Sequence, residues 1–220
     1  MERVLIIGES GAIGGAVAAH LRGQGCEVTG LSRSADGLDV TDGASVAAAL
    51  EGLGPFDMVL VATGALEIGE AGPEKALRDI DGTAMAAQFA LNAIGPALVL
   101  RHAADLLPRE GRSVFAVLTA RVGSIGDNRL GGWYSYRAAK AAANQIVHGA
   151  AIELGRSHKQ AICVALHPGT VQSDLTAKYL GRHPAVPPAE AAENLLNVIG
   201  NLRTVDSGGF FDWRGESVEW

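Results

Sequence analysis

The chain has 220 residues, of which 48% are hydrophobic and 19% charged, a composition that permits one well-buried core. This length is typical of one domain, so we expect residues 1–220 to form a single domain. The net charge of −6, with no Lys/Arg cluster, argues against nucleic-acid binding. No apolar run approaches the roughly 18–20 residues of a membrane span, and no signal peptide precedes the first strand-like run. We therefore expect a cytoplasmic protein with no membrane partner.

Short apolar runs alternate with Ala-rich segments along the chain. The runs predict strands at 4–8, 26–31, 57–62, 113–119 and 161–166, and the segments predict helices at 13–23, 42–53, 73–107, 134–154 and 188–202. Continuous apolar strands are buried on both faces, as in a parallel sheet covered by helices. The pattern predicts an α/β fold, a Rossmann-type doubly wound and mainly parallel sheet with helices on both faces.

Two details qualify this pattern. After the second strand, residues 32–37 lead directly to Leu38-Asp39-Val40, which leaves too few residues for a crossover helix, so we expect one helix to be missing there. The helix predicted at 73–107 is expected to break near Gly95-Pro96.

Cys26 and Cys163 lie in apolar runs and are interpreted as buried thiols, and no Cys or His spacing predicts a metal site.

A glycine-rich turn, Gly8-Glu9-Ser10-Gly11-Ala12-Ile13-Gly14, lies between the first strand and the first helix. Glycines permit a tight turn and a close approach of backbone to a pyrophosphate, and the helix N-terminus offers N–H groups to that anion. The turn therefore predicts a dinucleotide site, with Gly8, Ser10, Gly11, Ile13 and Gly14 as contacts. Glu9 is an objection, because a carboxylate there would repel a phosphate.

The second strand ends at Leu31, and Ser32-Arg33 follow it where NAD-binding folds usually carry an acidic residue. An Arg at this place accommodates the 2′-phosphate of NADP, so the sequence favours NADP(H) over NAD(H). The alternative interpretation is that Arg33 is simply a solvated loop residue.

Tyr136 and Lys140 lie four residues apart at the start of a predicted helix, a spacing that puts both on one face. A free phenol has a pKa of about 10, and a neighbouring ammonium lowers it toward neutrality, which makes proton transfer to a carbonyl oxygen feasible. This pattern is common by itself, and a purely structural pair is the default unless other features accompany it.

The glycine loop, Tyr136, Lys140 and Asn92 together resemble the short-chain dehydrogenase/reductase family, and the resemblance covers nearly the whole chain. The compact length, Gly123-Ser124-Ile125 and the ending 209–213 look most like its C-factor-like and small carbonyl-reductase branch. The resemblance implies further cofactor contacts at Asp39, Val40, Ala62, Thr63, Gly64, Pro168, Gly169, Val171 and Ser173, besides Ser32, Arg33, Tyr136 and Lys140.

The same resemblance implies the catalytic roles. Tyr136 would act as general acid in reduction, Lys140 would lower the pKa of Tyr136 and hold the nicotinamide ribose, and Asn92 would support a proton-relay water. A serine hydroxyl would polarise the substrate carbonyl. Where the family often has Ser-Ser, this chain has Thr119-Ala120, so Ser124 is the preferred candidate and Thr119 the substitute. Ala12 also departs from the family's usual glycine spacing.

The leading functional hypothesis is hydride transfer between NADP(H) and a small carbonyl or alcohol substrate, by a Ser-Tyr-Lys-Asn mechanism. The alternative is a dinucleotide-binding sensor or signalling protein with weak turnover, which Ala12 and Ala120 favour. An epimerase or dehydratase of the extended relatives would need a larger region after Gly169. The resemblance also implies a homodimer or homotetramer formed by the helices that carry Asn92 and Tyr136, and residues 172–187 are expected to cover the substrate.

Overall fold

The structure is a computed structural model that describes residues 1–69, 72–179 and 185–220. A six-stranded, fully parallel sheet has the order β2-β1-β3-β4-β5-β6. The strands are β1 (Arg3–Ile7), β2 (Glu27–Leu31), β3 (Met58–Val61), β4 (Ser113–Leu118), β5 (Ala161–His167) and β6 (Phe210–Asp212). The helices are α1 (Ala12–Gly23), α2 (Arg33–Asp36), α3 (Gly43–Leu50), α4 (Gly82–Phe89), α5 (Gly95–Leu100), α6 (Ala103–Leu106), α7 (Tyr134–Ser157) and α8 (Pro188–Asn201). The predicted Rossmann-type fold is confirmed.

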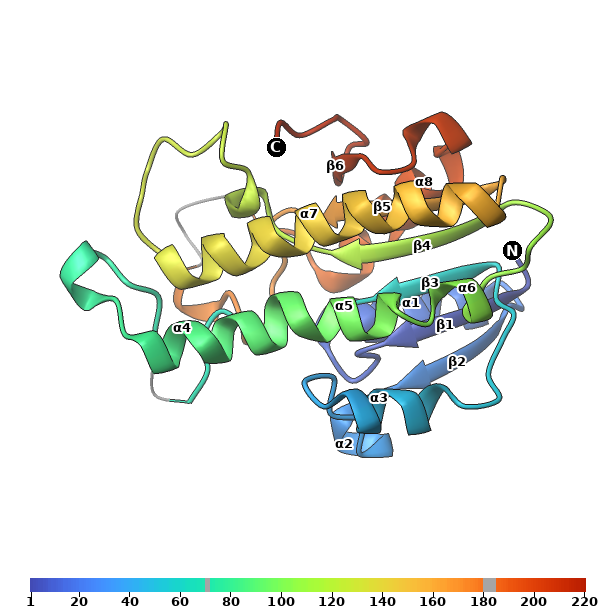
Figure 1. The fold of residues 1–220 in the computed structure, drawn as a ribbon, viewed down its shortest axis with the longest axis horizontal. Coiled ribbons are helices and arrows are strands. Elements are labelled where there is room, and N and C mark those ends of the chain that lie inside the picture. The colour runs from blue at the N-terminus through green and yellow to red at the C-terminus, as the bar shows by residue number, and fades with distance from the viewer. Residues whose placement is uncertain (70–71, 180–184) are drawn as a thin grey trace.

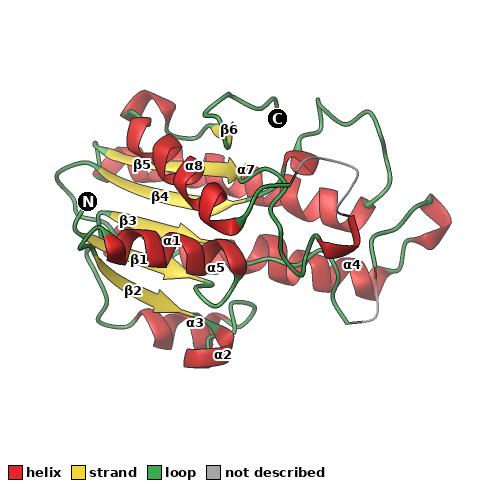
Figure 2. Cartoon of the chain, turned by 180° about the vertical axis from the view of Figure 1, so that it is seen from behind, coloured by secondary structure: helices red, strands yellow, loops and turns green. Residues whose placement is uncertain are grey.

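Helices cover both faces of the sheet. In Figure 1, α4, α5 and α7 run across the near face, and Figure 2 shows α1 and α8 side by side on the opposite face. The strand side chains alternate between two apolar cores: Leu5 and Ile7 belong to the core under α7, whereas Val4 and Ile6 belong to the core under α1 and α8. Because both faces are buried, these strands read as continuous apolar runs in the sequence.

The region after β2 is shorter than in the usual fold, as predicted. Between β2 and Leu38 the chain forms only a single helical turn, α2. Leu38-Asp39-Val40 is then a loop with no strand character. Ser32 caps this turn by accepting the backbone N–H of Ala35, at 3.2 Å. Consequently β2 is an edge strand, and it lies close to the solvent-facing helices α2 and α3 (Figure 1).

The predicted break near Gly95-Pro96 is wrong. The helix continues from Gly82 to Leu100 through a π-helical turn at Ala90–Ile94, and its end comes at Arg101-His102. A proline removes one helical N–H and crowds the carbonyl four residues before it. The wider π turn loosens the hydrogen-bond ladder at that place, so Pro96 is accommodated within the helix.

The same helix corrects the expectation that no apolar run is long enough for a membrane span. By length and composition alone, the helix Gly82–Leu100 is long and apolar enough to cross a membrane. In its most apolar window, 39% of the residues are buried inside the structure. A core helix of a soluble protein passes the same test, and this one packs against α7. The last strand, β6, was not predicted, because Phe210–Asp212 is too short for an alternation pattern.

Candidate active site

The strand order reverses between β1 and β3, and the carboxyl ends of both strands lie at the same edge of the sheet. Such a switch point is where open α/β folds bind their ligands. The side of the molecule on which this edge lies also holds α4 and the start of α7 (Figure 1). The segments predicted to bind a dinucleotide, 8–14, 32–33 and 62–64, directly follow β1, β2 and β3.

The glycine turn after β1 is built so that side chains are excluded. Gly8 has a φ of +94°, and a Cβ on Gly14 would lie 2.3 Å from the carbonyl oxygen of Gly8. Gly11 is the N-cap of α1 and provides no capping side chain. The first N–H groups of α1, those around Ile13, therefore lack partners within the helix and are directed at the turn. Ser10 and Gly11 are exposed there, which suits contact with a ligand.

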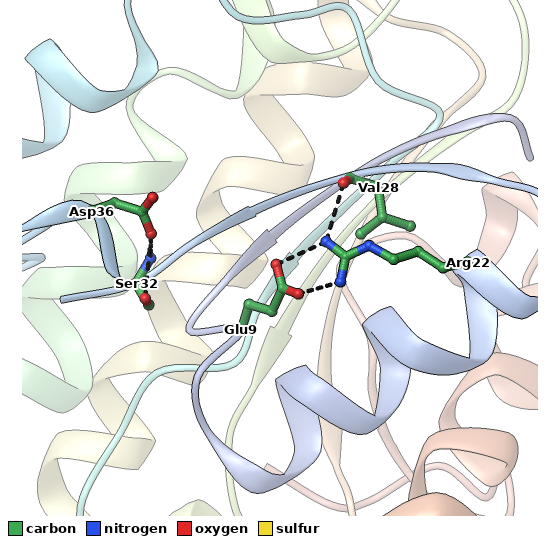
Figure 3. Close-up of polar contacts among 5 residues, drawn as sticks. All are labelled: Glu9, Arg22, Val28, Ser32 and Asp36. Atoms are coloured by element: carbon green, nitrogen blue, oxygen red, sulfur yellow. Dashed lines mark hydrogen bonds and ion pairs between the residues drawn. The ribbon is translucent and has the colours of Figure 1, made fainter. Parts of the chain in front are cut away.

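Glu9 does not point freely into this turn. Its carboxylate forms a two-point ion pair with the guanidinium of Arg22 on α1, with one N–O distance of 3.1 Å (Figure 3). Arg22 also donates to the carbonyl oxygen of Val28, at 3.3 Å. The carboxylate occupies the space where a Cβ on Gly30 would lie, 1.1 Å from its Oε2. The pairing neutralises the charge that made Glu9 an objection to phosphate binding.

The end of β2 carries a carboxylate that sequence reasoning missed. Asp36 folds back from α2 and accepts the backbone N–H and the hydroxyl of Ser32, at 2.7 and 3.2 Å (Figure 3). The only sequence signal is an acidic residue four positions after a capping serine. Arg33 is exposed at the same place. Asp39 accepts the hydroxyl and the N–H of Thr41, and these bonds, followed by the charge of Arg33, hold the pKa of Asp39 low.

The segment after β3 is held by the helix that contains the π turn. The side-chain amide of Asn92, fully buried, accepts the N–H of Ala65 (3.2 Å) and donates to the carbonyl oxygen of Ala65 (2.9 Å). Gln88 accepts a bond from Asn92 (2.6 Å) and donates to the carbonyl oxygen of Leu66 (2.8 Å). Gln88 was also missed, although its position four residues before Asn92 places it on the same helix face.

Asn92 and Lys140 meet at Gly64, where φ is +154°. A Cβ on Gly64 would lie 2.8 Å from Oδ1 of Asn92 and 3.1 Å from Nζ of Lys140. The backbone of this residue is thus cradled between two of the predicted catalytic side chains. The neighbouring Ala62 donates its N–H to Ile7, at 2.8 Å, and the Thr63 methyl group packs beside Gly8, so the β1 and β3 ends form one surface.

Tyr136 and Lys140 lie on the first turns of α7 and are 8% and 3% exposed. Nζ of Lys140 lies 5.8 Å from the centre of the Tyr136 ring and donates to the carbonyl oxygen of Leu118, at 3.2 Å. Burial lowers the pKa of Lys140 to about 8 and raises the pKa of Tyr136. Burial sets the direction of the Tyr136 pKa in this structure, and the lowering of that pKa by Lys140 stays a prediction.

Neither of the two hydroxyl candidates belongs to the described lining of the cleft that holds Tyr136. Ser124 is buried and accepts the N–H of Asp127 at 3.0 Å, which leaves its own proton free to be donated. Thr119 is buried, and its hydroxyl has no hydrogen-bond partner among the described residues. Among the described residues, Ala120 lines the cleft beside Tyr136, whereas Ser124 and Thr119 do not.

That cleft has a volume of about 710 Å³ and opens beyond the carboxyl ends of β4 and β5. Tyr136 lies on its wall, together with Trp133 and Leu66. Gly169, one of the predicted cofactor contacts, lines the cleft and has a φ of +78°. Leu175 and Thr176, from the segment expected to cover the substrate, line it too. Pro168 is half-buried, Val171 is buried and paired with Val186, and Ser173 bonds Thr176. Residues 180–184 of the expected cover lie outside the described part.

A buried carboxylate fixes the start of α7. Trp133 is the N-cap residue, with a φ of +52°, and it supplies no side-chain cap. Glu74, 8% exposed, takes that role from the distant loop after β3: its carboxylate accepts the N–H and the hydroxyl of Ser135, and its carbonyl oxygen accepts the N–H of Trp133, at 2.6 Å. Nothing in the local sequence marks Glu74 as a cap for a helix sixty residues later.

A parallel Rossmann-type sheet with this glycine turn and this Tyr-Lys-Asn arrangement defines a dinucleotide-binding oxidoreductase fold. The family described as enoyl-(acyl carrier protein) reductase matches residues 37–206. The chain belongs to the short-chain dehydrogenase/reductase family of oxidoreductases, as the sequence resemblance predicted.

Two relatives resemble it over most of the chain. The 1-hydroxy-2-glutathionyl-2-methyl-3-butene dehydrogenase of Rhodococcus sp. is 32% identical over 236 aligned residues that cover all of both chains. The protein named C-signal from Myxococcus xanthus is 37% identical over 171 residues, 76% of this chain and 94% of its own.

Solved structures show the same fold. An NADPH-bound carbonyl reductase from chicken fatty liver has a TM-score of 0.82 at 22% identity and covers all of this chain and 94% of its own. A short-chain dehydrogenase/reductase from Burkholderia multivorans with bound NADP has a TM-score of 0.80 at 23% identity, over 100% and 99% of the two chains.

Proposed function

We propose that the protein transfers a hydride between NADP(H) and the carbonyl carbon of a ketone or aldehyde, or the corresponding alcohol. The observation that carries this proposal is the convergence of Lys140 and Asn92 on Gly64 while Tyr136, one turn before Lys140, lines an open cleft. A proton donor at a cleft wall beside a backbone surface free of side chains is what carbonyl reduction requires.

The residues present fit a dinucleotide. The glycine turn leaves helix N–H groups for the pyrophosphate, and glycine at positions 8, 14 and 64 lets the segments after β1 and β3 pack closely at this edge. Gly169 packs against Trp213, where a Cβ would lie 3.0 Å from the indole ring. When bound there, the cofactor supplies or accepts the hydride.

The chain's own part of the reaction is proton transfer. Because burial raises its pKa, the Tyr136 phenol is protonated at neutral pH, the form needed by a general acid that donates to the carbonyl oxygen. Lys140, held by Leu118, places a positive charge behind that phenol, which favours the phenolate that remains after donation. In alcohol oxidation the phenolate accepts the hydroxyl proton instead.

The preference for NADP(H) rests on the end of β2. Arg33 is exposed and available to a 2′-phosphate, whereas the Asp36 carboxylate is already bonded to the N–H and hydroxyl of Ser32. Both of these bonds go to one oxygen of Asp36, Oδ2, so the preference for NADP(H) depends on Arg33. The pairing of Glu9 with Arg22 also reduces repulsion of the phosphate.

We further propose that the protein is a homodimer or homotetramer that associates through the face formed by α4, α5 and α7. These helices lie side by side on one face (Figure 1). Ile94, in the π turn between α4 and α5, is 47% exposed, and Ile152 on α7 is 55% exposed. Burying such side chains against a second copy removes apolar surface from water. Size-exclusion chromatography with light scattering tests this, and a monomeric mass at micromolar concentration contradicts it.

A second function, a dinucleotide-binding sensor with weak turnover, is favoured by one observation. Ala120 lines the cleft where a catalytic serine is expected, so no hydroxyl at that position polarises the substrate carbonyl. The relative named C-signal is consistent with this alternative, although that name describes the Myxococcus protein.

The test begins with calorimetric titration of the protein with NADPH and with NADH. The NADPH complex is then screened against ketones, aldehydes and quinones by loss of NADPH absorbance. Tighter binding of NADPH, with consumption on a carbonyl compound, supports the reductase. Tight binding without turnover on any carbonyl supports the sensor, and no binding of either nucleotide contradicts both.

A further inference from the structure

The lining of the substrate cleft carries more cations than carboxylates, although the whole protein is acidic. Its described lining includes four cationic side chains and two acidic ones: Lys75, Arg121, Arg129, Arg137, Glu74 and Asp127. The whole chain, in contrast, has a net charge of −6. His167 also lines the cleft, but burial lowers its pKa to about 4, so it is neutral at pH 7. Asp212 and Glu216 also act on Arg121, so an attraction for anions comes from the lining cations that no carboxylate engages.

Both acidic side chains in the cleft are engaged within the protein. Glu74 is buried and bonded to Ser135 at the start of α7. Asp127 accepts Nε of Arg121, at 2.6 Å, and Arg121 also lies 3.8 Å from the carboxylate of Asp212. These contacts leave Glu74 and Asp127 little capacity to attract a cationic ligand.

The cations divide into two kinds. Arg121 is committed to two carboxylates, and Arg137 donates to the carbonyl oxygens of Gly132 and Val122, at 3.1 and 3.3 Å. Arg129 uses one nitrogen, donating to the carbonyl oxygen of Gly126 at 2.6 Å, and the rest of its guanidinium is exposed. Lys75 is exposed and has no side-chain partner among the described residues. Lys75 and Arg129 are therefore the cations that can bind a ligand.

The backbone brings the segments that carry these two cations together. Lys75 follows Glu74, and the carbonyl oxygen of Glu74 accepts the N–H of Trp133, four residues after Arg129. The lining of the same cleft also includes the apolar side chains of Leu66, Leu130 and Trp133.

We propose that the substrate carries an anionic group, a carboxylate or a phosphate, on an apolar skeleton whose carbonyl or alcohol lies at Tyr136, and that Lys75 and Arg129 bind that anion. This inference rests on the proposed function for the identity of the reacting end. The anionic group would supply charge-assisted bonds at the rim, while the apolar skeleton fills the wall between the rim and Tyr136. Lys75 and Arg129 are then specificity-determining residues.

The test compares three substrates with one skeleton: an aryl ketone bearing a carboxylate on a short chain, its methyl ester and the matching phosphonate. Steady-state kcat/KM with NADPH is measured for the wild type, for Lys75→Gln with Arg129→Gln, and for Lys159→Gln. Lys159 is an exposed control, because it lies past the end of α7 and donates to Gly155, at 2.9 Å.

We expect the double variant to lower kcat/KM for the carboxylate about 10- to 100-fold, the usual effect of losing one or two charge-assisted bonds. For the ester, kcat/KM should change less than about twofold in the double variant. Lys159→Gln should change kcat/KM for neither substrate. Added salt should lower kcat/KM of the wild type for the carboxylate and not for the ester. The phosphonate shows whether a dianion is preferred. Equal kcat/KM for acid and ester in the wild type, or equal losses in the double variant, overturns the proposal.

If no substrate turns over, the reductase proposal fails but the anion site can still be measured. Calorimetric binding of the carboxylate and the ester to the NADPH-saturated protein then decides. The anion site is supported if the carboxylate binds at least about tenfold more weakly to the double variant than to the wild type. Such a difference corresponds to one charge-assisted bond. Equal binding of both compounds, or binding of neither, overturns it.

Discussion

The two ends of the proposed dinucleotide site are organised by different physics. At the β2 end the charged groups are partly exposed: Glu9 forms an ion pair with Arg22, and Asp36 accepts hydrogen bonds from Ser32 (Figure 3). At the α7 end the polar groups are buried and fixed by the backbone, Lys140 by Leu118 and Asn92 by Ala65. Exposed ion pairs contribute little and adjust easily, whereas buried polar groups shift their pKa values and tolerate little change.

The largest expected effect is at the buried end. Tyr136→Phe removes the proton donor and leaves the shape of the cleft, so kcat should fall about 10²- to 10⁴-fold. Affinity for NADPH should stay within about threefold, since cofactor binding and proton donation are separable losses. Stopped-flow turnover and calorimetry measure the two quantities. Tyr134→Phe is the matched control, because Tyr134 has no lysine four residues after it; retained turnover in Tyr136→Phe would remove Tyr136 from the mechanism.

Lys140→Met tests the buried charge by stability instead of activity. Burial lowers the pKa of Lys140 to about 8 in the folded protein, whereas a lysine in the unfolded chain has a pKa near 10.4. Between about pH 8 and pH 10.4 the unfolded chain therefore binds one proton more than the folded protein. The free energy of unfolding of the wild type rises with pH through that window. The methionine variant lacks this gain. Its stability relative to wild type should be highest below pH 8 and should decrease by on the order of 3 kcal/mol by pH 10.5.

Urea unfolding of both proteins at pH 7, 9 and 10.5 measures that difference. Lys159→Met, at an exposed lysine, should show no such trend. A difference between Lys140→Met and wild type that stays constant across the three pH values would show that the Lys140 pKa is not lowered by burial.

A smaller effect is expected from Arg33→Ala at the exposed end. Loss of its guanidinium removes a charge-assisted bond to the 2′-phosphate, so NADPH should bind roughly tenfold or more weakly while NADH changes little. Arg101→Ala, at an exposed arginine that ends α5, is the control. Equal weakening of both nucleotides would show that Arg33 does not read the phosphate.

The smallest effect is expected from Arg22→Gln. This change frees the Glu9 carboxylate, which should weaken NADPH binding by roughly two- to fivefold, the scale of a partly exposed ion pair. The double variant Arg22→Gln with Glu9→Gln should recover the wild-type affinity, because no unpaired charge remains. Calorimetry of the four proteins completes the cycle, and a double variant no better than Arg22→Gln would assign the effect to the bond from Arg22 to Val28.

The sequence by itself determined the local features whose causes lie within a few residues. Apolar runs fixed the first five strands, the Gly8–Gly14 turn fixed the start of α1, and the spacing of Tyr136 and Lys140 placed both on one helix face. The break at Pro96 was predicted wrongly, because a π turn relieves the proline and local propensity does not show it.

Only the tertiary structure decided the features that depend on residues far apart in the chain. Glu74 caps a helix that begins sixty residues later, Glu9 is neutralised by Arg22, and Ala120 instead of Ser124 faces the cleft. The pKa of Tyr136 is raised because packing removes water from the phenol. The spacing of Tyr136 and Lys140 in the sequence does not show how deeply the phenol is buried. Burial and long-range hydrogen bonds arise only when the sheet brings its loops to one edge, and those two effects set the chemistry of this site.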